Sequence, residues 1–145
     1  MNTAHALLAP VVLLVAWTLV MWLWMYLTRI PAILAARMRL DRNAPRGEQM
    51  SQLPPRVRWK ADNYNHLMEQ PTIYYAIVLT LALLGEQSAW AVGLAWAYAL
   101  LRVVHSLVQA LVNIIPLRFA MFVLSTLPLI GLTWLAALRV LSPAG

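Results

Sequence analysis

The chain has 145 residues, of which 62% are hydrophobic and 11% are charged, and its formal net charge is +6. This composition excludes an ordinary soluble domain and is typical of a one-domain membrane protein. The absence of cysteine excludes disulfides and any protein thiol as nucleophile or metal ligand. No basic block is interleaved with aromatic residues outside a loop that flanks the membrane, so we expect no nucleic-acid partner.

Four apolar stretches, at 7–27, 67–85, 89–115 and 119–141, follow one another along the chain. Each has about 19 to 27 residues, and at about 1.5 Å per residue that length crosses a hydrocarbon core of about 30 Å. Backbone groups in lipid must be satisfied within their own segment, which favours helices. The sequence therefore predicts an all-α membrane protein, a single domain over 1–145 with four transmembrane helices in an up-down bundle, at about 7–40, 56–85, 89–115 and 119–141.

The first helix and the loop after it set the predicted orientation. The first ten residues contain no Lys or Arg, and the first apolar stretch is too long for a signal peptide, so we expect a retained helix. Proline, glycine and asparagine between 41 and 55 indicate a loop. Residues 29–60 hold eight of the eleven basic residues. The positive-inside rule then predicts a cytoplasmic loop and two termini outside.

The second helix carries a polar stripe. Its sequence predicts a continuous helix from about 56 to 75, with Pro71 inside it. At 100° per residue, four polar residues fall within about 40° of one line, and a histidine lies beside them. They are Arg58, Asp62, Asn65 and Glu69, with His66 on the flank.

The third helix carries a matching stripe of Arg102, Ser106, Gln109 and Asn113, flanked by His105. The short link at 86–88 predicts that helices two and three form an antiparallel pair. Glu69 and Arg102 lie about 17 and 15 residues from this link, so their heights differ by only about 3 Å. We therefore expect a Glu69–Arg102 ion pair, with Asn65 opposite Ser106 and Gln109.

Two interpretations of these stripes stay open. Buried polar groups often only join membrane helices to one another. However, their number exceeds what joining two helices requires, and the surplus of cations favours an anionic ligand. His66 and His105 could bind a metal, but no third histidine lies near them in the sequence, so no metal site is predicted. Arg118, which follows Pro116, either anchors to lipid phosphate or reaches inward to a ligand.

These features resemble the membrane-associated proteins in eicosanoid and glutathione metabolism (MAPEG), over nearly the whole chain. In the prostaglandin E synthase branch, helix three carries Arg-x2-His-x3-Tyr-x8-Arg. Arg102, His105 and Arg118 keep that spacing, and Gln109 stands where the tyrosine would be. The Arg-x-Arg after helix one is matched by Arg37-Met-Arg39. In helix two the family has Asn three residues before Glu, whereas here that position is histidine and Asn comes one residue earlier.

The resemblance implies a homotrimer of a bacterial inner membrane that binds glutathione, as co-substrate, between subunits on the cytoplasmic side. It implies that Arg118 is catalytic and stabilises the glutathione thiolate. The residues expected to hold glutathione are Arg37, Arg58, Asp62, Asn65, His66, Glu69, Arg102, His105 and Gln109. The expected function is a glutathione-dependent transferase or peroxidase acting on a hydrophobic electrophile dissolved in the membrane lipid. The alternatives are a non-catalytic lipid-binding or scaffold protein of the same fold and a small four-helix transporter.

Overall fold

The computed structural model describes residues 3–141, and every regular element in that part of the chain is a helix. The helices are α1 (Thr3–Ala35), α2 (Glu48–Ser51), α3 (Pro55–Leu67), α4 (Gln70–Leu83), α5 (Ala89–Leu111) and α6 (Ile115–Leu141). By length and composition α1, α5 and α6 are able to cross a membrane. The prediction of an all-α protein with membrane-spanning helices is confirmed.

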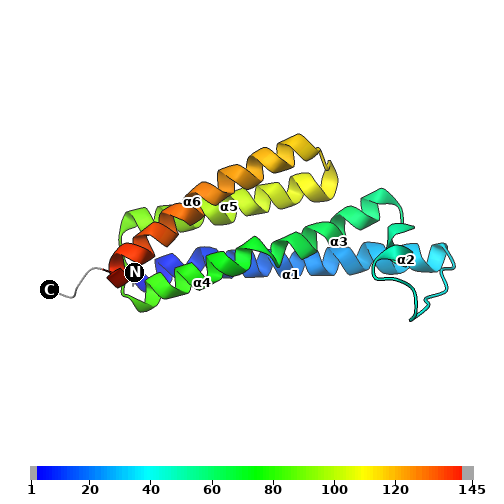
Figure 1. Cartoon of the computed structure of the whole chain (residues 1–145), viewed down its shortest axis with the longest axis horizontal. Helices are drawn as coiled ribbons and strands as arrows, with labels where there is room; N and C mark the ends of the chain where they lie inside the picture. Colours follow the sequence, from blue (N-terminus) through cyan, green and yellow to red (C-terminus); the bar gives the residue numbers. More distant parts are fainter. Residues whose placement is uncertain (1–2, 142–145) are drawn as a thin grey trace.

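The helices lie roughly along one axis (Figure 1). Helix α1 runs the length of the molecule, and α3 and α4 follow one another back along it. Helices α5 and α6 form a hairpin that packs on α1, α3 and α4. The start of α1, the α4–α5 link and the end of α6 therefore lie at one end. The 36–54 loop with α2 and the α5–α6 turn lie toward the other.

Helix α1 ends at Ala35, earlier than the predicted end near residue 40. Arg37 has a φ of 48°, and the amides of Arg37 and Met38 donate to the carbonyls of Leu34 (3.1 Å) and Ile33 (3.2 Å). This pattern is a Schellman motif, which usually places glycine at the left-handed position. Here an arginine occupies it, so no glycine marks the end of the helix in the sequence.

The predicted continuous second helix is interrupted. Helix α3 ends at Leu67 and α4 begins at Gln70. Pro71 explains the interruption, because it has no amide hydrogen to donate and its ring would clash with the carbonyl of Leu67 in a continuous helix. The two pieces have 13 and 14 residues, so neither alone is long enough to cross a membrane.

The turn between α5 and α6 also differs from expectation, since α5 ends at Leu111 and α6 begins at Ile115. Asn113 adopts a φ of 55°, a left-handed conformation that asparagine tolerates, and its amide donates to Val108 at 2.7 Å. Pro116 then falls in the first turn of α6, where its missing amide hydrogen costs nothing. Arg118 consequently belongs to the start of α6.

The core between the helices is built from apolar and aromatic contacts. Leu7, Leu14 and Met21, spaced seven residues apart on α1, are fully buried. Tyr74 of α4 stacks on Tyr98 of α5 with ring centroids 4.3 Å apart. Many large apolar side chains on the outside are exposed, including those on the outer faces of α1 and α6. Such a surface suits lipid rather than water.

A buried acid closes the end of the molecule that carries the α4–α5 link. Glu86 is only 3% exposed and accepts hydrogen bonds from the Ser88 amide (2.8 Å) and from Arg139 Nε (2.8 Å). The bonds from Ser88, assisted by Arg139, lower the pKa of Glu86 to about 2. This contact ties the link to the last turn of α6.

Candidate functional site

The polar stripe of α5 is buried, as its spacing predicted. Arg102 and Ser106 have no exposed surface, and Gln109 and His105 are 1% and 2% exposed. An apolar helix that buries four polar side chains must supply partners for them or bind something that does. Most of the candidate site is built around this stripe.

Ser106 is the best-paired member of the stripe. Its Oγ accepts a hydrogen bond from Asn63 Nδ2 at 2.6 Å and lies 2.9 Å from Trp17 Nε1, which also donates to it. The hydroxyl therefore joins α1, α3 and α5. The expected partner, Asn65, is exposed instead. That prediction was wrong because Asn63, on another side of α3, faces α5.

The expected ion pair between Glu69 and Arg102 does not form. Within residues 3–141, Glu69 pairs with His66, whose Nδ1 lies 3.0 Å from Glu69 Oε2, and its side chain is 69% exposed. Arg102 Nη2 instead donates to the backbone carbonyl of His66 at 3.3 Å. The turn at residues 68 and 69 is the physical reason, because it displaces Glu69 from the line of a continuous helix.

Several buried donors and acceptors near Arg102 have no hydrogen-bond partner within the described residues. They are Arg102 Nε and Nη1, His105 Nδ1, Gln109 Oε1 and Asn63 Oδ1. Leaving such groups unpaired costs free energy, so this part of the core is well suited to hold a polar ligand.

A pocket of about 400 Å³ lies between α3, α5 and α6, and of these groups it includes His105 in its lining. We call it the histidine pocket; its lining is His66, His105, Ile115, Arg118, Phe119 and Phe122. The His66 and His105 rings are 5.1 Å apart, and the His66 and Phe122 rings 5.4 Å apart. The Arg102 guanidinium lies 5.7 Å from the Phe122 ring centre. The pocket thus combines two histidines from α3 and α5 with an arginine and two aromatic rings from α6.

Arg118 lines the histidine pocket and is held there by the α5–α6 turn. Its Nη1 donates to Asn113 Oδ1 at 2.6 Å, while its Nε is buried without a partner in the described chain. Asn113 was predicted to continue the α5 stripe. The structure instead uses it to position Arg118.

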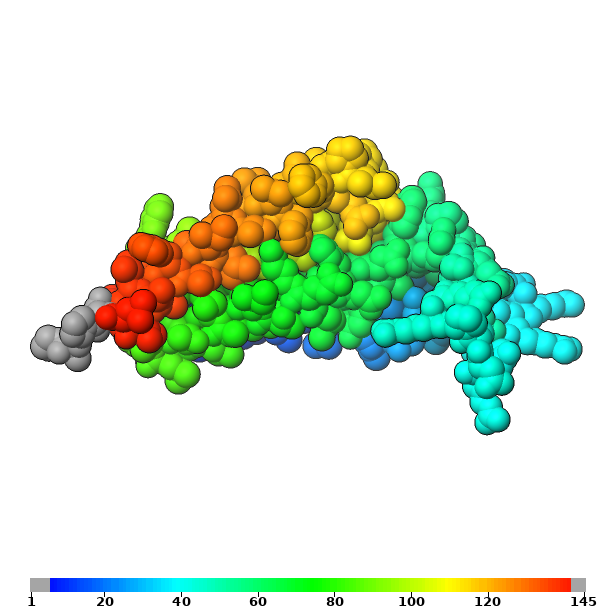
Figure 2. Space-filling model, in the orientation of Figure 1, coloured from blue at the N-terminus to red at the C-terminus, as the bar shows by residue number. Residues whose placement is uncertain are grey.

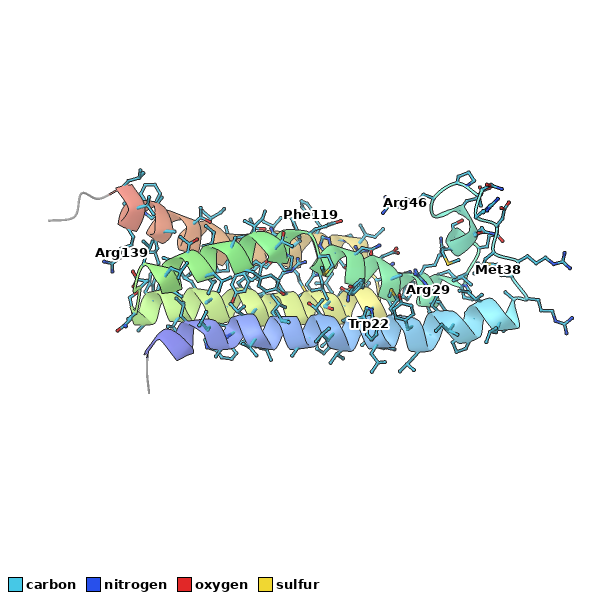
Figure 3. The ribbon with its side chains drawn as sticks, turned by 90° about the horizontal axis from the view of Figure 1, so that it is seen from below. Trp22, Arg29, Met38, Arg46, Phe119 and Arg139 are labelled. Atoms are coloured by element: carbon cyan, nitrogen blue, oxygen red, sulfur yellow. The ribbon has the colours of Figure 1, made fainter. Side chains whose placement is uncertain are left out.

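A second pocket, of about 370 Å³, lies between the end of α1, the loop before α2, and α3. We call it the arginine pocket; its lining is Arg29, Arg46, Gly47, Met50, Ser51, Arg58, Ala61, Asp62 and Asn65. Figure 3 shows Arg46 reaching from the loop back toward the helices, and Arg29 on α1. The two pockets share no lining residue.

The structure thus divides the predicted binding residues between two places. The histidine pocket and its surroundings contain His66, Glu69, Arg102, His105, Gln109 and Arg118. The arginine pocket contains Arg58, Asp62 and Asn65. Arg37 is exposed and lines neither pocket.

Some residues of these pockets could not be recognised from the sequence. Asn63 lies between two members of the predicted stripe, and only its burial distinguishes it from Asn65. Arg29 and Arg46 looked like ordinary positive charges at a membrane boundary. Residues 3–141 contain no group of three or more His, Cys, Asp or Glu side chains placed to hold a metal ion.

Comparison with known proteins adds one result. No curated protein and no solved structure matches the chain. A model of the MAPEG family matches residues 7–138, which is nearly the whole sequence. The chain therefore belongs to the MAPEG family.

Proposed function

We propose that this protein is a glutathione-dependent transferase or peroxidase that acts on a hydrophobic electrophile dissolved in the membrane. The observation that carries the proposal is that Arg118 lines one pocket together with His66, His105, Phe119 and Phe122. A guanidinium beside a thiol favours the thiolate, which is the nucleophile. The aromatic rings offer an apolar partner a place next to it.

The polar groups around Arg102 support the same proposal. Arg102 supplies donors, Gln109 supplies an acceptor and His105 supplies a ring nitrogen, all without a partner within the described residues. A tripeptide with amides and carboxylates could pair with such groups. Phe119 is 68% exposed at the pocket rim, so an apolar substrate could enter from the lipid without crossing water.

We place the membrane across α1, the α3–α4 pair, α5 and α6. Helices α3 and α4 follow one another along α1 (Figure 1), and this arrangement supports a fourth crossing made by the two together, since neither is long enough alone. We propose that the 36–54 loop is cytoplasmic, that both termini lie outside, and that the membrane is a bacterial inner membrane. The cluster of basic residues in and beside this loop supports that orientation.

We also propose a homotrimer with glutathione between subunits. The carboxylates of glutathione need cations, yet Arg37 lies outside the histidine pocket of its own chain. In addition, Glu69 is exposed at the α3–α4 junction. A neighbouring copy could bring Glu69 and Arg37 to the bound tripeptide.

The test is the thiolate absorbance at about 240 nm, measured on the purified protein after glutathione is added. This absorbance reports the ionised fraction of the thiol. Arg118→Lys keeps the charge but loses the planar set of donors. We expect a sharply smaller signal in Arg118→Lys and none in Arg118→Ala, with much smaller changes in glutathione binding measured by calorimetry. Arg39→Lys, at an exposed position outside both pockets, is the matched control and should behave as wild type.

An undiminished thiolate signal in Arg118→Ala would remove this residue from the chemistry. Together with unchanged lipid binding, that result would favour the alternative, a non-catalytic lipid-binding or scaffold protein of the same fold. If Arg118 only anchors the chain to lipid phosphate, Arg118→Lys should leave both stability and activity unchanged.

A further inference from the structure

The arginine pocket concentrates positive charge that the described chain does not neutralise. Arg29, Arg46 and Arg58 come from three different segments, and Asp62 is the one carboxylate in the lining. Within residues 3–141, the ion pairs are His66–Glu69 and Glu86–Arg139, so none of the three arginines has a carboxylate within ion-pair distance. The fold thus brings three guanidinium groups together although they repel one another.

Two of these guanidinium groups also lack hydrogen-bond partners. The Nε atoms of Arg29 and Arg58 are buried and unpaired within the described residues. Buried charged donors without an acceptor are costly, and an anion in the pocket would offset both that cost and the mutual repulsion. The planar fork of arginine matches the oxygens of a phosphate group, which is the anion it binds most readily along with carboxylate.

The pocket lies beside exposed apolar side chains of α1. Next to Arg29 on α1, Tyr26, Leu27 and Ile30 are 40%, 66% and 51% exposed. The Trp22 and Tyr26 rings meet edge to face at 5.2 Å, and such aromatic side chains gather at the level of lipid head groups. Beyond Arg29, side chains of the polar segment around residue 40 project away from the body (Figure 2). A phosphate in this pocket would sit at the membrane boundary.

We propose that the arginine pocket binds a phosphate-bearing anion, and that the head group of an anionic phospholipid is the favoured source over soluble phosphate. Arg29, Arg46 and Arg58 would contact the phosphate oxygens, and Asn65 would add an amide donor at the rim. This proposal assigns Arg58 and Asn65 a ligand other than glutathione. It does not depend on the proposed function, because the two pockets share no lining residue.

The experiment uses the purified full-length protein in a neutral detergent at fixed ionic strength. Short-chain phosphatidylglycerol, phosphatidylcholine of the same chain length, inorganic phosphate and glutathione are each titrated, and binding is followed by calorimetry and by the shift in thermal unfolding. The variants are Arg29→Gln, Arg58→Gln and Arg58→Lys. Arg42→Gln removes the same charge from an exposed position outside the pocket and is the matched control.

We expect phosphatidylglycerol to bind more tightly than phosphatidylcholine. Its affinity should fall by about tenfold or more in Arg29→Gln and Arg58→Gln, because each loses a charge-assisted hydrogen bond, and by less than about twofold in Arg42→Gln. Arg58→Lys keeps the charge and should fall between wild type and Arg58→Gln, which tests the site even if Arg58→Gln folds poorly. Inorganic phosphate that binds with the same dependence on Arg29 and Arg58 would identify the source as soluble phosphate.

Two results would overturn the proposal. Equal losses of affinity in Arg42→Gln and in the pocket variants would show only general attraction of lipid to a basic loop. Competition between glutathione and phosphatidylglycerol, with the same dependence on Arg29 and Arg58, would make this pocket part of the glutathione site. In the first case the thiolate signal of Arg29→Gln and Arg58→Gln stays at the wild-type level, whereas in the second case it falls together with glutathione binding. Arg118→Ala tests the thiolate chemistry separately, so the two proposals can fail separately.

Discussion

A single buried hydroxyl, that of Ser106, should carry much of the contact between three helices. It accepts hydrogen bonds from Asn63 at 2.6 Å and Trp17 at 2.9 Å, and both Ser106 and Asn63 have no exposed surface. Ser106→Ala removes the acceptor and leaves two donors unpaired. Because alanine differs from serine only by the loss of the hydroxyl oxygen, the change should act mainly through these hydrogen bonds and little through packing.

The expected magnitude follows from the two contacts. A buried polar group left unpaired costs about 1–3 kcal/mol, while hydrogen bonds between membrane helices average about 0.6 kcal/mol with a maximum near 1.7. Trp17 is only partly buried, whereas Asn63 has no exposed surface. We therefore expect Ser106→Ala to lower the free energy of unfolding by about 1–3 kcal/mol, most of it through Asn63.

Reversible unfolding in mixed micelles, followed by circular dichroism, would measure this change without relying on Trp17 fluorescence. Ser125→Ala is the matched control. Ser125 also has no exposed surface, but its hydroxyl donates only to the Phe122 carbonyl of its own helix, at 2.8 Å. That substitution should cost less than about 0.5 kcal/mol, because no other helix loses a partner.

A double-mutant cycle completes the test. In an Asn63→Leu background the amide donor is gone, so Ser106→Ala should lower the free energy of unfolding by at most about half as much as it does in the wild type. Equal costs for Ser106→Ala and Ser125→Ala, or strict additivity with Asn63→Leu, would refute the inference that Ser106 joins α3 to α5.

Three further predictions concern orientation, pH and the exposed acid at the α3–α4 junction. In sealed cells an impermeant maleimide should label Gln87→Cys and spare Ser51→Cys in this cysteine-free chain; labelling of position 51 alone would reverse the proposed orientation. Because the pKa of Glu86 falls to about 2 from an ordinary 4.5, its contribution to stability is present above about pH 4.5 and is lost as the pH falls toward 2. Glu86→Gln should therefore weaken the dependence of the unfolding free energy on pH between about pH 2 and pH 4.5. An unchanged pH dependence would assign the acid sensitivity to other groups. Glu69→Gln should cost less than about 1 kcal/mol, since the side chain is 69% exposed, and a cycle with Arg102→Gln should show almost no coupling. Coupling above about 1 kcal/mol would mean that the two side chains do pair.

The sequence was informative about the long apolar helices and about which face of α5 is buried and polar. Hydrophobic length located the apolar helices, because a crossing helix satisfies its own backbone whatever its neighbours are. The burial of Arg102, Ser106 and Gln109 also followed from spacing alone. On a mostly apolar helix, a face that carries several polar side chains is easy to recognise from the sequence.

The partner of that face could not be predicted in the same way. Helix α3 is polar on several sides, with Asn63 buried and both Asp62 and Asn65 exposed. Helical spacing groups residues on a face, but it does not say toward which neighbour the face turns. The interruption before Pro71 adds to the difficulty, because residues on either side of it no longer share one helical phase.

The interruption between α3 and α4 has an electrostatic consequence of its own. Each helix carries a macrodipole, so the end of α3 is partly negative and the start of α4 is partly positive. Arg102 donates to a carbonyl at the end of α3, and Glu69 occupies the N-cap position of α4. Each charge therefore complements a helix end instead of the other charge. The interrupted helix lets a mostly apolar bundle hold the Glu69 carboxylate and the Arg102 guanidinium without an ion pair between them. Neither group therefore has to be released from the other before a ligand binds.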